Sequence, residues 1–143
     1  SSSDNMRCFE CCGTSIVRYL PENSQGRIFH TNHPLVNQDV RSDVPPEKKR
    51  SKNTVARLDS ISHRLGDANR TMTLEDIKSA LAAHDDPENP VSRRVNLRNI
   101  GNSIGYTAGA SIYEFGAKPR LHLASGPPCE TEFETFDFKD IDL

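Results

Sequence analysis

Two amphipathic helix patterns occupy the middle of the chain and limit what the rest can form. Residues 53–66 carry an apolar residue at every third or fourth position and end at Gly66, where a left-handed helix end is favoured. The apolar positions are Val55, Leu58, Ile61 and Leu65. Residues 73–84 begin with Thr73 and carry Asp76 three residues later, a variant of the capping box. We therefore expect two consecutive helices, each with one apolar face to bury.

An extended pattern precedes the helices. Residues 6–19 are rich in β-branched, aromatic and small apolar types, and residues 21–26 are dense in turn formers. The segment RIFHTN then resumes an extended pattern, which stops at Pro34. We expect a β-hairpin over about residues 7–33.

A second extended pattern follows the helices. Residues 106–115 and 120–125 predict two strands joined by a turn at GAKP, and three aromatic residues in the tail are expected to dock as a strap. These residues are Phe133, Phe136 and Phe138. The order of hairpin, two helices and hairpin predicts an α+β fold in which helices cover one face of an antiparallel sheet.

Composition limits the size of the core and the range of partners. Hydrophobic residues make up 34 % of the 143 residues and charged residues 27 %, so we expect one domain with a thin core. The formal net charge of -2 leaves no overall field for nucleic acid or an acidic membrane. No apolar run approaches the ~20 residues of a membrane-spanning helix, so we expect a soluble protein. The compartment, cytoplasm or periplasm, stays open. Residues 1–6 are expected to be disordered or artificial, and 37–52 to form an exposed loop within the domain 7–143.

The four cysteines leave two interpretations open. Cys8, Cys11 and Cys12 lie together in CFECC, and Cys129 lies in GPPCE. A structural zinc site needs four ligands in two close pairs, and the second pair is missing, so we expect small buried thiols and no metal. A stand-alone α+β binding module that uses the cluster for metal or thiol chemistry remains the alternative.

The stretch HTNHP places unusual hydrogen-bonding capacity at a predicted strand end. On an extended strand His30 and Asn32 share one face, and Thr31 and His33 share the other. The Asn32 amide has two N–H donors, which suit an oxyanion, a role worth roughly 3 to 4 kcal/mol per donor. His30 would line the same pocket, whereas His33 is expected to make structural bonds. Asparagine beside proline is also a common turn residue, so a purely structural role stays open.

Several motifs in order along the chain carry a resemblance to a known family. HTNHPL is the most specific piece, followed by NTVARL, TLEDIKSALAAHD, NPVSR, GASIYEF and LHLASGPPCETEF. Over roughly residues 6–138 the chain resembles the C-terminal portion of the acyl-coenzyme A:isopenicillin N acyltransferase family. These autoproteolytic N-terminal-nucleophile hydrolases are related to choloylglycine hydrolase and penicillin V acylase. The resemblance implies a four-layer αββα sandwich that acts on linear amides or acyl thioesters.

The resemblance also implies roles for individual residues. Asn32 matches the asparagine that donates to the oxyanion, and Arg57 matches an arginine that holds charge near the nucleophile, with Thr54 for the usual serine three positions earlier. Helical periodicity alone places Arg57 on the flank of the apolar stripe, where an ordinary surface arginine also fits. Arg93 in NPVSR is a second candidate for binding substrate, in addition to His30.

The same resemblance places the nucleophile outside these residues. The family's N-terminal cysteine lies upstream of the strand that matches residues 7–19, so we expect a fragment or subunit that is inactive alone. Its expected partners are the upstream half or subunit carrying that cysteine and a small acyl amide, in an oligomer without cofactor, metal, nucleic acid or membrane. The substrate itself is not specified by these residues.

Overall fold

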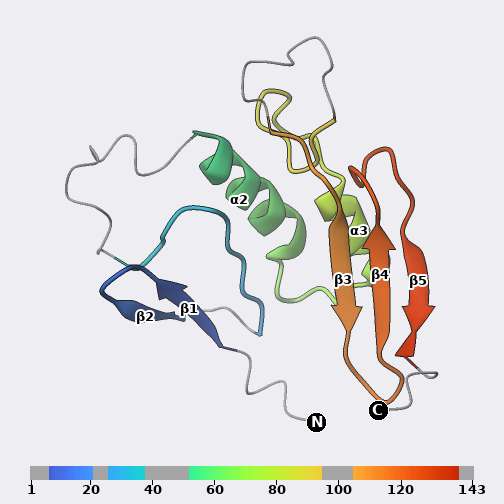
Figure 1. Cartoon of the computed structure of the whole chain (residues 1–143), viewed down its shortest axis with the longest axis horizontal. Coiled ribbons are helices and arrows are strands. Elements are labelled where there is room, and N and C mark those ends of the chain that lie inside the picture. Colours follow the sequence, from blue (N-terminus) through green and yellow to red (C-terminus); the bar gives the residue numbers. More distant parts are fainter. Residues whose placement is uncertain (1–6, 21–25, 38–51, 95–104, 139–143) are drawn as a thin grey trace.

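The computed structural model describes residues 7–20, 26–37, 52–94 and 105–138, which form two helices and two antiparallel sheets (Figure 1). The elements are β1 (Cys8–Cys11), β2 (Ile16–Tyr19), α2 (Lys52–Leu65), α3 (Leu74–Leu81), β3 (Ala110–Glu114), β4 (Arg120–Ala124) and β5 (Glu134–Asp137). The expected α+β class is therefore confirmed. The expectations for residues 1–6 and for nearly all of the loop 37–52 lie outside the described residues.

Both predicted helices form, and local chemistry sets their ends. At the start of α3 the Thr73 hydroxyl accepts from the Asp76 N–H at 3.2 Å, and the Thr73 N–H donates to the Asp76 carboxylate at 2.9 Å, which completes the expected capping box. The helix ends at Leu81, short of the expected 84. At the end of α2 the Gly66 N–H donates to the Ser62 carbonyl at 2.8 Å.

The reason for glycine at position 66 differs from the expected one. The backbone of Gly66 is not left-handed, because the positive φ found among the described glycines belongs to Gly26. A Cβ on Gly66 would instead overlap the Ser62 carbonyl oxygen. The helix therefore ends on a glycine because the backbone approaches itself too closely for any side chain.

The N-terminal hairpin is shorter than expected. Strands β1 and β2 pair antiparallel from Cys8 opposite Tyr19 to Cys11 opposite Ile16. Residues 26–37 form a loop without helix or strand, so the strand expected at 27–33 is wrong. Backbone N–H groups near the end of this segment donate to the Glu10 side chain and not to a neighbouring strand. Figure 1 shows the loop passing between the β1-β2 hairpin and α2.

The second sheet has three strands in the order β3-β4-β5. The expected hairpin of β3 and β4 is confirmed with narrower bounds, and Tyr113 lies opposite Leu121. The tail adds β5 to this sheet, with Phe136 opposite Leu121. Phe136 and Phe138 remain 46 % and 38 % exposed, so the docking expected of these two is wrong, whereas Phe133 is half-buried against α3. Phe136 is the aromatic residue of β5, and its register with Leu121 and the exposed Tyr113 places it on the outer face of the sheet.

The core is small, as the composition predicted. Among the described residues the buried apolar side chains are Leu65, Ala80, Ala83 and Ala124. Helices α2 and α3 contact each other, and α3 lies against the segment that leads into β5, where the Lys78 ammonium is 5.9 Å from the centre of the Phe133 ring. No helix in the described part of the chain is long and apolar enough to cross a bilayer.

Candidate functional site

The loop between the hairpin and α2 brings together the two residues expected to act on substrate. The Arg57 Nη2 atom on α2 donates to the Asn32 Oδ1 atom of the loop at 2.8 Å. The Arg57 Nε atom donates to Asn53 one helical turn earlier, at 3.1 Å. Residues 25 positions apart in the sequence therefore meet at one point of the surface.

The contact with Arg57 orients the Asn32 amide. A guanidinium group has only donors, so the amide oxygen must face it and the Nδ2 group must face away. Asn32 is exposed, and Nδ2 has no hydrogen-bond partner among the residues that the structure describes. The arrangement leaves two N–H donors available to a ligand, directly in front of a positive charge.

The positive charge beside Asn32 is not neutralised within the described ranges. Burial lowers the pKa of Arg57, and the charge of Arg93 lowers it further. No ion pair joins Arg57 or Arg93 to a carboxylate in the described part of the chain. The backbone N–H of Arg93 donates to the Thr107 hydroxyl at 2.9 Å, which fixes this segment. Asn32, Arg57 and Arg93 thus form a region suited to an anion or a developing oxyanion.

His30 points away from this region. Its Nε2 atom lies 2.9 Å from the Glu10 carboxylate, and its ring meets the edge of Tyr19 with centroids 5.9 Å apart. Because the loop is not a strand, the expected alternation of faces does not hold, and His30 and Asn32 contact different elements. The substrate role expected for His30 remains a prediction.

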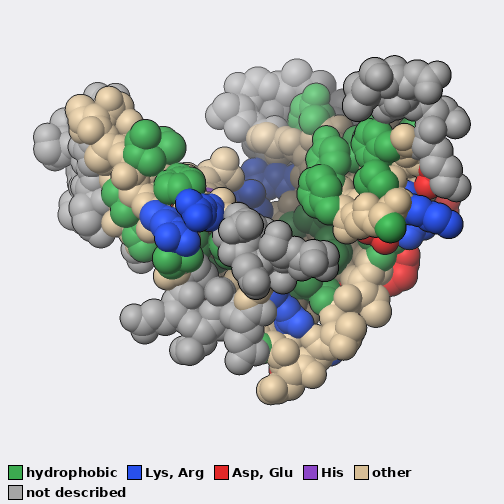
Figure 2. Space-filling view, turned by 90° about the horizontal axis from the view of Figure 1, so that it is seen from below, with side chains coloured by type: hydrophobic (Ala, Val, Ile, Leu, Met, Phe, Trp, Pro, Cys, Tyr) green, Lys and Arg blue, Asp and Glu red, His purple; other side chains and the backbone are tan. Residues whose placement is uncertain are grey.

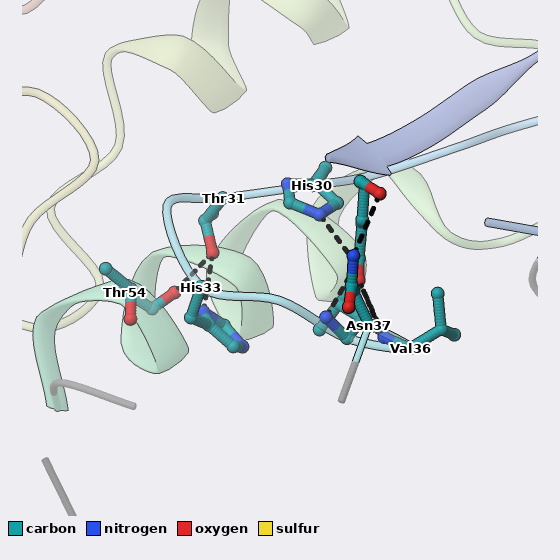
Figure 3. A network of polar contacts seen from close by, with 8 residues as sticks. His30, Thr31, His33, Val36, Asn37 and Thr54 are labelled. Atoms are coloured by element: carbon teal, nitrogen blue, oxygen red, sulfur yellow. Dashed lines mark hydrogen bonds and ion pairs between the residues drawn. The ribbon is translucent and has the colours of Figure 1, made fainter. Parts of the chain in front are cut away.

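Thr31 ties the loop to α2, and His33 contacts Thr31. The Thr31 hydroxyl donates to the Thr54 carbonyl at 2.9 Å and lies 3.0 Å from the His33 Nδ1 atom. His33 is buried, with 4 % of its surface exposed. Figure 3 shows these three residues together on the side of the helix, while His30 and Asn37 lie on the other side of the loop.

Glu10 is the residue of this region that the sequence analysis did not single out. Its side chain is 5 % exposed and accepts from the backbone N–H groups of Leu35, Val36 and Asn37 at 2.6, 2.9 and 2.6 Å. Burial raises the pKa of Glu10, but these three bonds and the one to His30 outweigh it and lower the pKa to about 2. The sequence feature that could have identified Glu10 is that it is the one acidic residue in the otherwise apolar strand β1.

The cysteines make no disulfide among the described residues. Cys11 is exposed, so the expectation of buried thiols is wrong for this position, while Cys8 and Cys12 are half-buried. The Cys129 thiol accepts from the buried Ser92 hydroxyl at 3.1 Å. Within the described ranges no group of three or more His, Cys, Asp and Glu side chains is placed to hold a metal ion.

No protein-family model, curated protein or solved structure matches the chain. The functional assignment of this region therefore rests on its own contacts and on the motifs quoted above. Of these contacts, the pair formed by Asn32 and Arg57 has the most direct chemical meaning, because it sets the direction of free donors next to a cation.

Proposed function

We propose that the chain supplies the oxyanion-binding part of a cysteine-dependent amidohydrolase or acyltransferase that acts on linear amide bonds. The nucleophilic cysteine comes from polypeptide outside residues 1–143 and completes the active site beside Asn32. The substrate is a small acyl amide. In this proposal the complete enzyme has the four-layer αββα sandwich fold.

One contact carries the proposal. The hydrogen bond from Arg57 to Asn32 turns both amide donors of Asn32 outward, with the guanidinium charge behind them. Donors that are oriented before the reaction stabilise a developing oxyanion at no further cost of reorganisation. A simple turn asparagine would need neither the arginine partner nor the adjacent Arg93 charge.

The proposed reaction uses these donors in its first step. The sulfur of the partner's cysteine thiolate bonds to the amide carbonyl carbon, and the carbonyl π electrons move onto the oxygen. Asn32 Nδ2 donates to that oxyanion, and the Arg57 charge favours it. When the carbonyl re-forms, the C–N bond breaks and the amine leaves with the proton that the thiol gave up. That proton is held meanwhile by the free α-amino group of the cysteine. Water or an amine then attacks the thioester carbonyl, the C–S bond breaks, and the proton of the attacking group passes through the α-amino group to the cysteine sulfur.

Exposed apolar surface supports a chain that other polypeptide completes. On the three-stranded sheet Tyr113 is 57 % and Phe115 86 % exposed, and their rings stack with centroids 6.3 Å apart. On the hairpin Phe9 and Ile16 are 51 % and 72 % exposed. Figure 2 shows hydrophobic side chains at the surface over both sheets. Exposed apolar surface of this kind is typical of protein interfaces. We propose that a sheet of the completing polypeptide packs on it.

Co-expression with the upstream polypeptide tests the activity. The complex is assayed with N-acyl amino acids and penicillin V, and Asn32→Ala is expected to lower kcat by about 10²- to 10³-fold. Arg57→Lys keeps a positive charge but loses the planar group that orients the amide, so we expect a smaller loss. Asn69→Ala, at an exposed asparagine in the turn after α2, is the matched control and should leave turnover unchanged.

Three results would contradict parts of the proposal. Unchanged turnover in Asn32→Ala would remove Asn32 from the mechanism. Turnover by the 143-residue chain alone would mean that the nucleophile lies within it. A stable complex with an intact cysteine that cleaves none of these amides would contradict the proposed activity.

A further inference from the structure

The 30–37 segment presents Asn32 without any secondary structure of its own. Residues 26–37 contain neither helix nor strand, and within the described part of the chain side-chain contacts hold the segment that carries the amide. Three contacts hold residues 27–32 of this loop to α2. Arg27 donates to the Leu65 carbonyl at 2.6 Å, Thr31 donates to Thr54, and Arg57 donates to Asn32.

The second half of the segment is held by β1, chiefly through Glu10. The Glu10 carboxylate accepts from three consecutive backbone N–H groups at Leu35, Val36 and Asn37. The Asn37 side chain donates to the Glu10 carbonyl at 3.1 Å and accepts from the Ser15 hydroxyl at 3.1 Å. Glu10 of the hairpin therefore makes most of the hydrogen bonds at this end of the loop.

Glu10 also binds the segment on the other side of Asn32. Its Oε1 atom lies 2.9 Å from His30 Nε2 and 2.6 Å from the Leu35 nitrogen. A single carboxylate oxygen thus joins the residue two positions before Asn32 to the residue three positions after it. Figure 3 shows His30 and Asn37 on one side of the loop and Thr31 on the other.

We propose that Glu10 is a positioning residue for Asn32, because its carboxylate closes the 30–37 segment into a ring and so holds the Asn32 amide against Arg57. The effect on catalysis rests on the proposed function, whereas the effect on the position of Asn32 does not. Glu10 does not contact the Asn32 amide itself. It acts on Asn32 through His30 and the three backbone N–H groups.

The ionised state of Glu10 fits this role. Three backbone donors and His30 outweigh the effect of burial and hold the pKa of Glu10 near 2, so the carboxylate is charged at every physiological pH. The other titratable groups at this place include His30, which binds the carboxylate, Tyr19, which meets His30, and Cys8, whose charge acts on Tyr19. Burial, with the charges of Cys8 and Glu10, raises the pKa of Tyr19.

NMR of the isotope-labelled 143-residue chain tests the positioning directly. Glu10→Gln keeps the size of the side chain but replaces one acceptor oxygen with an N–H₂ group. We expect it to shift the backbone amide signals of Leu35 and Val36 and, with them, the side-chain amide signals of Asn32. Glu114→Gln is the control, because Glu114 is also a hydrogen-bonded carboxylate but belongs to the other sheet.

In the reconstituted complex, Glu10→Gln is expected to lower kcat on the order of 10²-fold with little change in KM, since a small displacement of a donor has effects of this size. Glu10→Asp keeps the charge and should recover part of the activity. Positioning is overturned if Glu10→Gln moves the Leu35 and Val36 signals and leaves those of Asn32 in place. If Glu10→Gln does not fold, the same comparison is made with Glu10→Asp. Absence of turnover in the wild-type complex would count against the proposed function and not against the NMR result.

Discussion

Replacing Glu10 by glutamine should destabilise the chain by an amount that depends on pH. The drop in the Glu10 pKa from its ordinary value of 4.5 to about 2 corresponds to about 3 kcal/mol in favour of the ionised, folded state. Because the pKa is lowered on folding, this stability is fully present above pH 4.5 and is lost as the pH falls toward 2. Glutamine cannot ionise, so the variant lacks this contribution at every pH.

The expected result is a difference in the free energy of unfolding that closes in acid. At pH 7 the wild type should exceed Glu10→Gln by about 3 kcal/mol, and the gap should narrow steadily below pH 4.5. Other carboxylates also titrate in this range, among them Asp76 and Glu114, whose hydrogen bonds outweigh burial and lower their pKa values. Their contributions are the same in both proteins and cancel in the difference.

Urea unfolding followed by far-ultraviolet circular dichroism measures this difference, since the chain has no Trp for fluorescence. Measurements between pH 3 and pH 7 cover the range in which the gap should change. A gap that stays constant over this range would refute the reasoning, because it would mean that the loss comes from shape and not from the Glu10 charge. A gap near zero at pH 7 would show that the three backbone bonds contribute nothing net.

Three further predictions concern other parts of the fold. Gly66→Ala should cost about 1 to 3 kcal/mol in thermal or urea unfolding, because the new Cβ overlaps the Ser62 carbonyl, whereas Gly116→Ala, with no atom within 4 Å, should stay within about 0.5 kcal/mol. Thr73→Ala removes the N-cap of α3 and should cost about 1 kcal/mol, with loss of helical circular dichroism at elevated temperature. Phe115→Ser, at a side chain 86 % exposed, should leave stability unchanged and raise the concentration at which the isolated chain begins to scatter light.

The helices could be predicted because their signals are local. The Thr73 and Asp76 contacts span three residues, and the apolar stripe of α2 repeats within one helix. The end of α2 at Gly66 was also predicted, although the reason was wrong, since the sequence does not reveal how closely the backbone returns to Ser62.

The loop of the candidate site could not be predicted from local pattern. RIFHTN continues the extended pattern of the preceding strand, but the backbone N–H groups that follow it bind Glu10, which lies 25 to 27 positions away. The prediction for Phe136 was wrong for a related reason. Whether this residue docks or lies on an added strand depends on whether β4 has a free edge to pair with, which local sequence does not show. The resemblance marked Arg57 as a charge near the nucleophile, and periodicity left it on the flank of its helix, so its hydrogen bond to Asn32 was not predicted.

The small buried core has a consequence for calorimetry. Three of the four buried apolar residues in the described ranges are alanines, at positions 80, 83 and 124, so unfolding exposes little new hydrocarbon to water. The heat-capacity change should therefore fall below the about 12–15 cal/mol/K per residue of ordinary globular domains. A small heat-capacity change flattens the dependence of stability on temperature, so cooling should neither protect the isolated chain strongly nor denature it.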